Sequence, residues 1–83
     1  MENNWYVYIL RCRDDSLYTG ITRDVEKRLA THNRGTGAKY TRSRTPVELV
    51  YSEVCSDKSG ALRRELEIKA LTRQKKLELI REK

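Results

Sequence analysis

Three segments of the chain carry the apolar patterns of β-strands. Residues 5–12 are almost continuously apolar, aromatic or β-branched, which is typical of a strand buried on both faces. A polar stretch of hairpin length, residues 13–16, leads to residues 17–21, so the second strand is expected to pair antiparallel with the first. Residues 47–55 alternate between apolar and polar side chains and predict a third strand.

Capping residues and glycines divide the interval between the second and third strands into a helix and a loop. Thr22 or Asp24 can cap a helix that ends near Asn33, because two glycines follow shortly after it. Residues 35–45 are polar and basic, which predicts a loop.

Two further helices are predicted after the third strand. Ser56 or Asp57 begins a helix that runs to about Leu71, and Thr72 caps a last helix over residues 73–83. The predicted fold class is therefore α+β, a small three-stranded antiparallel sheet flanked by helices in the order ββαβαα.

Length and composition bound the size and location of the protein. Eighty-three residues, of which 37% are apolar, provide one thin core and hence a single domain over residues 1–83. No apolar run approaches the roughly 20 residues of a membrane span, and the acidic, polar N-terminus is unlike a secretory signal, so a cytoplasmic protein is expected. Cys12 and Cys55 lack CxxC spacing, which favours two buried thiols over a disulfide or a metal site.

The net charge of +6 is confined to one segment. Residues 27–47 contain six basic residues and no acidic one, whereas the rest of the chain carries twelve residues of each sign. Such a cationic segment predicts a nucleic-acid-binding surface, and the alternative is a solvated basic loop that serves solubility. The residues expected to contact nucleic acid are Arg23, Lys27, Arg34, Lys39, Arg42 and Arg44.

Strand alternation brings two tyrosines toward each other. Tyr6 and Tyr8 lie on one face of the first strand, and Tyr18 and Gly20 share a face of the second. The glycine removes a side chain beside two phenols, which is expected to leave room for a ligand to approach the sheet.

An arginine and the only histidine border the apolar stripe of the first helix. Val25 and Leu29 form the stripe, and at 100° per residue His32 lies about 20° and Arg28 about 60° from Val25. Arg28 and His32 are also spaced i,i+4, so their side chains share a face. Both are candidates for a functional site, and the alternatives are a structural histidine and an arginine that reaches along the surface to solvent.

A carboxylate lies within the apolar arc expected for the helix that follows the third strand. The apolar residues of this arc are Ala61, Leu62, Leu66 and Ile68. Glu65 and Lys69 fall inside it, and a core-facing carboxylate is costly unless it is paired or binds a metal. Mg²⁺ is suited to a single carboxylate with waters, and the alternative is an internal Glu65–Lys69 ion pair.

These features together form the pattern of a known family. The tripeptides Tyr6-Val7-Tyr8 and Tyr18-Thr19-Gly20, the spacing through residues 18–32 and the segment 61–65 resemble the GIY-YIG nuclease superfamily. The stretch 37–41 resembles the branch that includes eukaryotic structure-specific nuclease subunits. The resemblance covers nearly the whole chain, and the small single-domain bacterial members are the most similar in organisation.

The resemblance implies metal-assisted phosphodiester hydrolysis. Glu65 would hold one Mg²⁺ (or Mn²⁺), and Tyr8 or Tyr18 would act as general base or orient the attacking water. Arg28 would stabilise charge on the phosphorus, and His32 would transfer a proton or hold a phosphate. A phenol with the ordinary pKa near 10 is a poor base at pH 7, so the catalytic role requires a metal or Arg28 to lower that pKa.

The expected function is a divalent-metal-dependent endonuclease that acts on nucleic acid, DNA in preference to RNA, with branched or single-stranded DNA as candidate substrates. Because family members with defined roles carry an additional domain, a protein partner that supplies specificity is also expected. The alternative is a non-catalytic nucleic-acid-binding module on the same scaffold, and a purely structural role is a third option.

Overall fold

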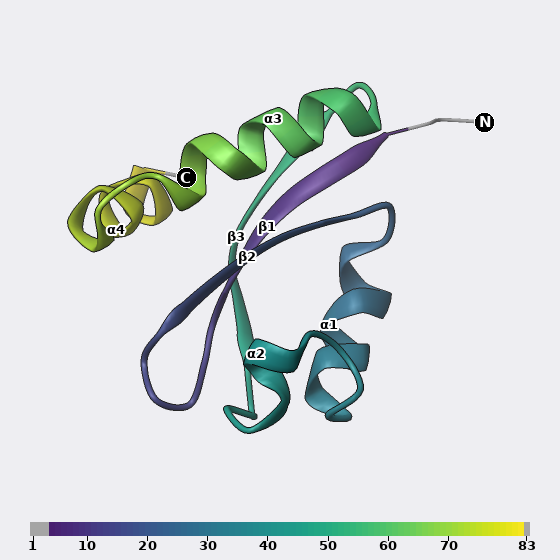
Figure 1. The fold of residues 1–83 in the computed structure, drawn as a ribbon, viewed down its shortest axis with the longest axis vertical. Helices are drawn as coiled ribbons and strands as arrows, with labels where there is room; N and C mark the ends of the chain where they lie inside the picture. Colours follow the sequence, from purple (N-terminus) through teal and green to yellow (C-terminus); the bar gives the residue numbers. More distant parts are fainter. Residues whose placement is uncertain (1–3, 83) are drawn as a thin grey trace.

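Three strands form one antiparallel sheet in the order β2–β1–β3, with the first strand in the centre (Figure 1). The computed structural model describes residues 4–82. Its elements are β1 (Trp5–Arg11), β2 (Leu17–Thr22), α1 (Val25–Asn33), α2 (Lys39–Arg42), β3 (Glu48–Cys55), α3 (Lys58–Lys69) and α4 (Arg73–Glu82). The predicted α+β class and antiparallel sheet are confirmed. The predicted end of the last helix at Lys83 and the residues before Asn4 lie outside the described part of the chain.

The central strand presents different side chains to the two faces of the sheet. Val7 and Ile9 pack on one face against the buried Ala61 and Ile68 of α3. Tyr8 packs on the other face in a second cluster of buried residues, toward α1 and α2. In Figure 1 the sheet accordingly lies between α3 on one side and α1 with α2 on the other. The predicted alternation along the first strand is confirmed.

Local hydrogen bonds fix both ends of α1. The Asp24 carboxylate accepts from the Lys27 backbone N–H at 3.1 Å and caps the first turn. After the last turn Gly35 has φ +81°, a left-handed conformation that favours glycine. The Asn33 side chain accepts from the Val47 N–H at 2.7 Å and donates to the Val47 carbonyl at 3.0 Å, so it ties the end of α1 to the start of β3.

The segment predicted as a loop contains one turn of helix, α2. Its only buried residue is Thr41, whose hydroxyl donates to the Ala38 carbonyl at 3.0 Å. The prediction of a loop across residues 35–45 is therefore wrong at its centre. A single turn is too short to show apolar periodicity, and this one is held by a polar side chain.

The face of α3 that meets the sheet is narrower than predicted. Ala61 and Ile68 are fully buried, but Leu62 is 43% and Leu66 69% exposed. The Lys69 side chain is 51% exposed as well, so its expected place in a core-facing arc is wrong. Helical periodicity identifies residues that share a face of α3, but it does not fix which part of that face packs on the sheet.

The two cysteines are not joined in a disulfide. Cys12 is buried and Cys55 half-buried, and both are free thiols. Within residues 4–82, none of the helices combines the length and apolar character that a membrane crossing requires.

Candidate active site

The Tyr8 ring lies directly over Gly20 of the neighbouring strand. The two residues are paired across β1 and β2. A Cβ atom added at Gly20 would come within 2.6 Å of the Tyr8 hydroxyl oxygen and 2.8 Å of its Cζ. Glycine is thus required here, but the Tyr8 ring fills the space that was expected to admit a ligand, and that expectation is wrong.

The Tyr8 hydroxyl forms a hydrogen bond with a fully buried histidine, His32. His32 has 0% exposure, and its Nε2 lies 2.9 Å from the Tyr8 hydroxyl. Its Nδ1 lies 2.7 Å from Oγ1 of Thr41, which also has 0% exposure. Both ring nitrogens are therefore occupied inside the protein, which leaves neither for a phosphate. Of the two roles expected for His32, only proton transfer fits this arrangement.

Gly37 lets the chain pass close to this histidine. A Cβ added at Gly37 would contact Nδ1 of His32 and would lie 2.8 Å from its Cγ. The backbone after α1 can therefore fold over the imidazole and bring Thr41 to it only because position 37 has no side chain.

Burial and Arg28 set the protonation states of this pair. Burial lowers the pKa of His32, and the positive charge of Arg28 lowers it further. Burial also raises the pKa of Tyr8 to about 12, although hydrogen bonding and charge from the Arg28 guanidinium oppose the rise. Both groups are consequently neutral at pH 7. The expectation that Arg28 would lower the Tyr8 pKa is correct in direction, but burial outweighs it.

Arg28 and Tyr18 complete the cluster around Tyr8. Arg28 is half-buried, one turn before His32 on α1, and its side chain interacts with the Tyr8 phenol. The ring centroids of Tyr18 and His32 are 5.3 Å apart, and those of Tyr18 and Tyr8 are 6.4 Å apart. The structure thus brings together the four residues that the sequence named as catalytic candidates.

Tyr40 extends the cluster toward solvent, and sequence reasoning assigned it no role. Its ring stacks on Tyr18 at a centroid distance of 5.9 Å, and the Arg44 guanidinium carbon lies over the Tyr40 ring, 4.1 Å from its centroid. Arg44 also donates to the Tyr40 carbonyl at 2.7 Å and pairs with Asp14 at 3.0 Å. Arg44 therefore has a structural task besides its predicted contact with nucleic acid. The segment 37–41 was the available signal for Tyr40 and Thr41.

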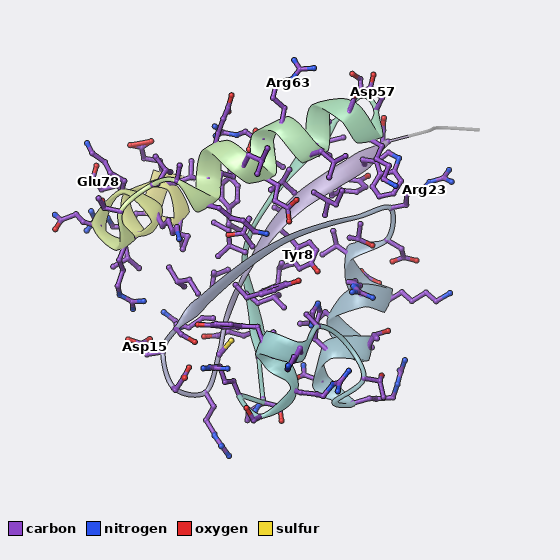
Figure 2. All side chains as sticks on the ribbon, viewed as in Figure 1. Tyr8, Asp15, Arg23, Asp57, Arg63 and Glu78 are labelled. Atoms are coloured by element: carbon purple, nitrogen blue, oxygen red, sulfur yellow. The ribbon has the colours of Figure 1, made fainter. Side chains whose placement is uncertain are left out.

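Glu65 lies on α3, and its charge acts on the Tyr8 phenol. Figure 2 shows Tyr8 near the middle of the molecule, between the layer of α3 and that of α1. The negative charge of Glu65 is among the influences that raise the Tyr8 pKa, so the carboxylate is within electrostatic reach of the phenol. Its side chain is only 16% exposed, and Oε2 pairs with Nζ of Lys69 at 3.0 Å. The ion pair named as the alternative is thus present.

The donor set around Glu65 fits a metal that needs few protein ligands. Residues 4–82 contain no group of three or more His, Cys, Asp or Glu side chains placed to hold an ion. Oε1 of Glu65 makes no hydrogen bond or ion pair within the same described range. One carboxylate with waters and substrate phosphates is a common arrangement for Mg²⁺, whereas a zinc site requires three or four protein ligands.

The predicted nucleic-acid-binding residues differ in the hydrogen bonds and ion pairs that their side chains form within the protein. Lys27, Lys39 and Arg42 are exposed and form no ion pair with any residue in 4–82. Arg34 is exposed and donates to Thr31 Oγ1 at 3.2 Å. Arg23 is exposed at the end of β2, beside the start of α1. The first three cations are therefore the best placed to bind phosphates.

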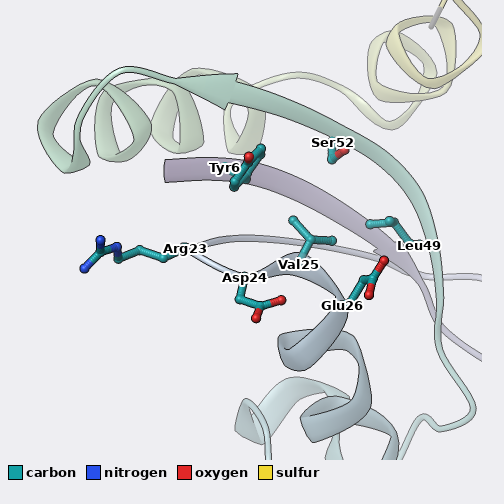
Figure 3. A pocket seen from close by; sticks show the side chains of 7 residues that line it. All are labelled: Tyr6, Arg23, Asp24, Val25, Glu26, Leu49 and Ser52. Carbon is teal, nitrogen blue, oxygen red and sulfur yellow. The ribbon is translucent and has the colours of Figure 1, made fainter. Parts of the chain in front are cut away.

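A separate groove lies at the start of α1 (Figure 3). Its volume is about 400 Å³, and the residues that line it are Tyr6, Arg23, Asp24, Val25, Glu26, Leu49 and Ser52. In Figure 3 the Arg23 side chain extends away from the other six. None of the candidate catalytic residues lines this groove, so the Tyr8–His32 pair and the groove are distinct features of the same sheet face.

The family follows from the fold, the site and a direct comparison. A model of the GIY-YIG catalytic domain matches residues 4–78, and the chain belongs to the GIY-YIG family. The resemblance noted from the sequence is confirmed.

The similar proteins are bacterial and of nearly the same length. A UPF0213 protein of Staphylococcus haemolyticus is 62% identical over 78 residues, which cover 94% of this chain and 95% of the relative. A solution NMR structure of the UPF0213 protein from Bacillus halodurans is 50% identical, with a TM-score of 0.63 over 96% of this chain and 85% of that one. A second NMR structure, of a protein from E. faecalis, is 44% identical with a TM-score of 0.61, over 95% of this chain and 88% of that one.

Proposed function

We propose that this protein is a divalent-metal-dependent endonuclease that hydrolyses phosphodiester bonds in DNA. The observation that carries the proposal is the buried Tyr8–His32 hydrogen bond, with the Arg28 guanidinium beside the phenol and the Glu65 carboxylate within electrostatic reach of it. This combination offers a proton acceptor and a fixed positive charge beside one hydroxyl group, with a carboxylate that could hold a metal within electrostatic reach, and these are the groups that phosphodiester hydrolysis uses.

Proton transfer in the proposed reaction passes through Tyr8 to His32. With a pKa of about 12, roughly one Tyr8 in 10⁵ is ionised at pH 7, so the phenolate is too scarce to serve as the base. The neutral phenol can instead accept a proton from the attacking water while it gives its own proton to Nε2 of His32. The water oxygen bonds to phosphorus, and the bond from phosphorus to the leaving oxygen breaks, with its electron pair passing to that oxygen, which takes a proton from solvent.

Arg28 has two effects on this reaction. Its positive charge stabilises the negative charge that develops on the phosphate. The same charge lowers the His32 pKa in the free protein, and a bound phosphate offsets it, so His32 becomes a better proton acceptor when substrate is present.

Glu65 is proposed to hold Mg²⁺ or Mn²⁺ through its carboxylate. Lys69 is half exposed, so its ammonium group can move to solvent and leave the carboxylate to a cation. A divalent ion held there would supply Lewis-acid stabilisation of the charge on the phosphate oxygens.

The proposed substrate class is branched or single-stranded DNA, bound through Lys27, Lys39 and Arg42. These three exposed cations belong to the segment that carries the whole excess of positive charge. A protein partner that directs the activity remains part of the proposal.

The test is cleavage of a panel of flap, fork, junction and single-stranded DNAs, and of RNA, with Mg²⁺ or Mn²⁺. Glu65→Gln is expected to lower cleavage at least about a thousandfold, since loss of the metal ligand removes several kcal/mol of transition-state stabilisation. The matched control is Glu67→Gln on the same helix, where a more exposed carboxylate pairs with Arg64 at 3.1 Å. The control should cleave like wild type.

Equal cleavage by wild type and Glu65→Gln on every substrate would overturn the proposal. If that shared level of cleavage were no higher than background and DNA binding survived, the non-catalytic binding module would be the better explanation. The existing Glu65–Lys69 ion pair, which satisfies the carboxylate without a metal, is the observation in its favour.

A further inference from the structure

Three buried groups form one directed chain of hydrogen bonds that ends on a backbone carbonyl. The Thr41 hydroxyl lies 3.0 Å from the Ala38 carbonyl oxygen, which can only accept, so Thr41 donates its one proton there. Oγ1 of Thr41 is also 2.7 Å from Nδ1 of His32. Because the hydroxyl proton is already used, Oγ1 accepts from Nδ1, and Nδ1 must carry hydrogen.

The proton on Nδ1 determines what the opposite nitrogen can do. In a neutral imidazole only one nitrogen is protonated, so Nε2 of His32 presents a lone pair. The Tyr8 hydroxyl at 2.9 Å therefore donates to Nε2. The three hydrogen bonds therefore run in one direction, from Tyr8 to His32, from His32 to Thr41 and from Thr41 to Ala38. This direction follows because the Ala38 carbonyl oxygen can only accept.

We infer that Thr41 is a positioning residue that holds His32 in the Nδ1–H tautomer and so keeps Nε2 free to take the Tyr8 proton. The hydrogen-bond partners of the Thr41 hydroxyl are His32 and the Ala38 carbonyl. Thr41 acts on the reaction only through the imidazole, in the way that a third group orients the base in a hydrolytic triad.

The local fold is built around this contact. Thr41 is the only buried residue of α2, and its side chain has 0% exposure. The chain reaches His32 by passing over it at Gly37, where a Cβ would collide with the imidazole. The hydrogen bond to His32 and the stacking of Tyr40 on Tyr18 are the contacts that hold this one-turn helix against the site, and only the first reaches the imidazole nitrogen.

The tautomer can be measured directly by ¹⁵N NMR, because His32 is the only histidine in the chain. Two-bond ¹H–¹⁵N correlations of the imidazole at pH 7.5 should show hydrogen on Nδ1 and none on Nε2. Thr41→Ser keeps the hydroxyl and should give the same pattern. Thr41→Val keeps the shape without the acceptor, and at least half of the population should move to the Nε2–H form.

Tyr8→Phe identifies which neighbour controls the imidazole, and it keeps the test decisive if Thr41→Val does not fold. The variant removes the group on Nε2 and leaves Thr41 in place. His32 should remain Nδ1–H in Tyr8→Phe. An Nε2–H tautomer in wild type, a switch to Nε2–H in Tyr8→Phe, or an unchanged pattern in a folded Thr41→Val protein would each overturn the inference.

The consequence for activity rests on the proposed function and is measured separately. Thr41→Val should lower kcat about tenfold or more with little change in KM, and Thr41→Ser should restore most of it. The NMR result does not require turnover. A correct tautomer without any cleavage would refute the nuclease proposal alone, whereas cleavage with the wrong tautomer would refute the role of Thr41 alone.

Discussion

The two faces of the sheet use the same strand for different purposes. On the α3 and α4 side, β1 contributes Val7 and Ile9 to a core whose other buried members are Tyr51, Ala61 and Ile68. On the α1 and α2 side, the alternate residue Tyr8 enters a network that includes the fully buried His32 and Thr41. The first face gains stability from apolar contact, and the second uses burial to control the protonation of polar groups.

This difference indicates which substitutions should affect stability and which should affect activity. Burial of apolar surface stabilises the fold in proportion to the area removed from water. Burial of a phenol and an imidazole shifts their pKa values away from those in water, toward the neutral forms. A substitution with the opposite effect on either face would contradict this difference between the two faces.

The largest expected effect is on the apolar face. Ile68→Ala removes a fully buried side chain and should lower the free energy of unfolding by about 2–5 kcal/mol. The control is Leu66→Ala on the same helix, where the side chain is 69% exposed and the cost should stay within about 0.5 kcal/mol. Urea unfolding followed by circular dichroism measures both. Equal losses would mean that α3 packs on the sheet through a different face.

A smaller effect is expected from the pH dependence of the polar face. The folded pKa of His32 lies below the ordinary 6.5, so the unfolded chain binds a proton more readily than the folded protein. The stabilisation that comes from neutral His32 is therefore present above pH 6.5 and is lost as the pH falls through and below that value. Unfolding free energies at pH 7.5 and 5.5 should differ more in wild type than in His32→Asn.

Wild type and His32→Asn contain the same carboxylates. The contribution of these groups to the pH dependence of the unfolding free energy therefore cancels, to first order, when the two proteins are compared. If the two proteins lost the same free energy of unfolding between pH 7.5 and 5.5, His32 would not be held neutral by the fold.

The smallest effect on stability is expected at the exposed cations, where binding should change instead. The double variant Lys39→Ala with Arg42→Ala should unfold within about 0.5 kcal/mol of wild type. The slope of log affinity for DNA against log salt should become shallower by about 1–2, because each lost phosphate contact contributes roughly 0.7–0.9. The matched control is Arg63→Ala with Arg81→Ala in α3 and α4. A slope unchanged in the first double variant, or equally reduced in the control, would show that the segment 27–47 does not carry the binding.

Regular periodicity explains which parts of this molecule could be predicted from the sequence. The antiparallel pairing of the strands that carry Tyr8 and Tyr18 followed from the hairpin length of the polar stretch between them, and the shared face of Arg28 and His32 followed from the helical repeat. The place of Glu65 on an apolar stripe was also predictable from the helical repeat, and the structure leaves only 16% of its side chain exposed. These residues lie in elements long enough to show a pattern.

The missed features depend on single contacts between distant parts of the chain. Thr41 and Tyr40 lie in a one-turn helix, and only the folded structure places them against His32 and Tyr18. Leu62 and Leu66 were assigned to the core because they are apolar, yet α3 meets the sheet along a narrower stripe. No repeat in the sequence reports on the direction in which a helix docks.

The most direct test of the account is the location of a divalent ion. Crystals of the protein grown with Mn²⁺ and a phosphorothioate-protected DNA would reveal the ion by its anomalous scattering. The proposed metal site predicts a Mn²⁺ peak at coordinating distance from the Glu65 carboxylate, with Lys69 moved away from it and a DNA phosphate between the ion and Arg28. An intact Glu65–Lys69 ion pair with no metal at Glu65, while DNA occupies the protein, would contradict it.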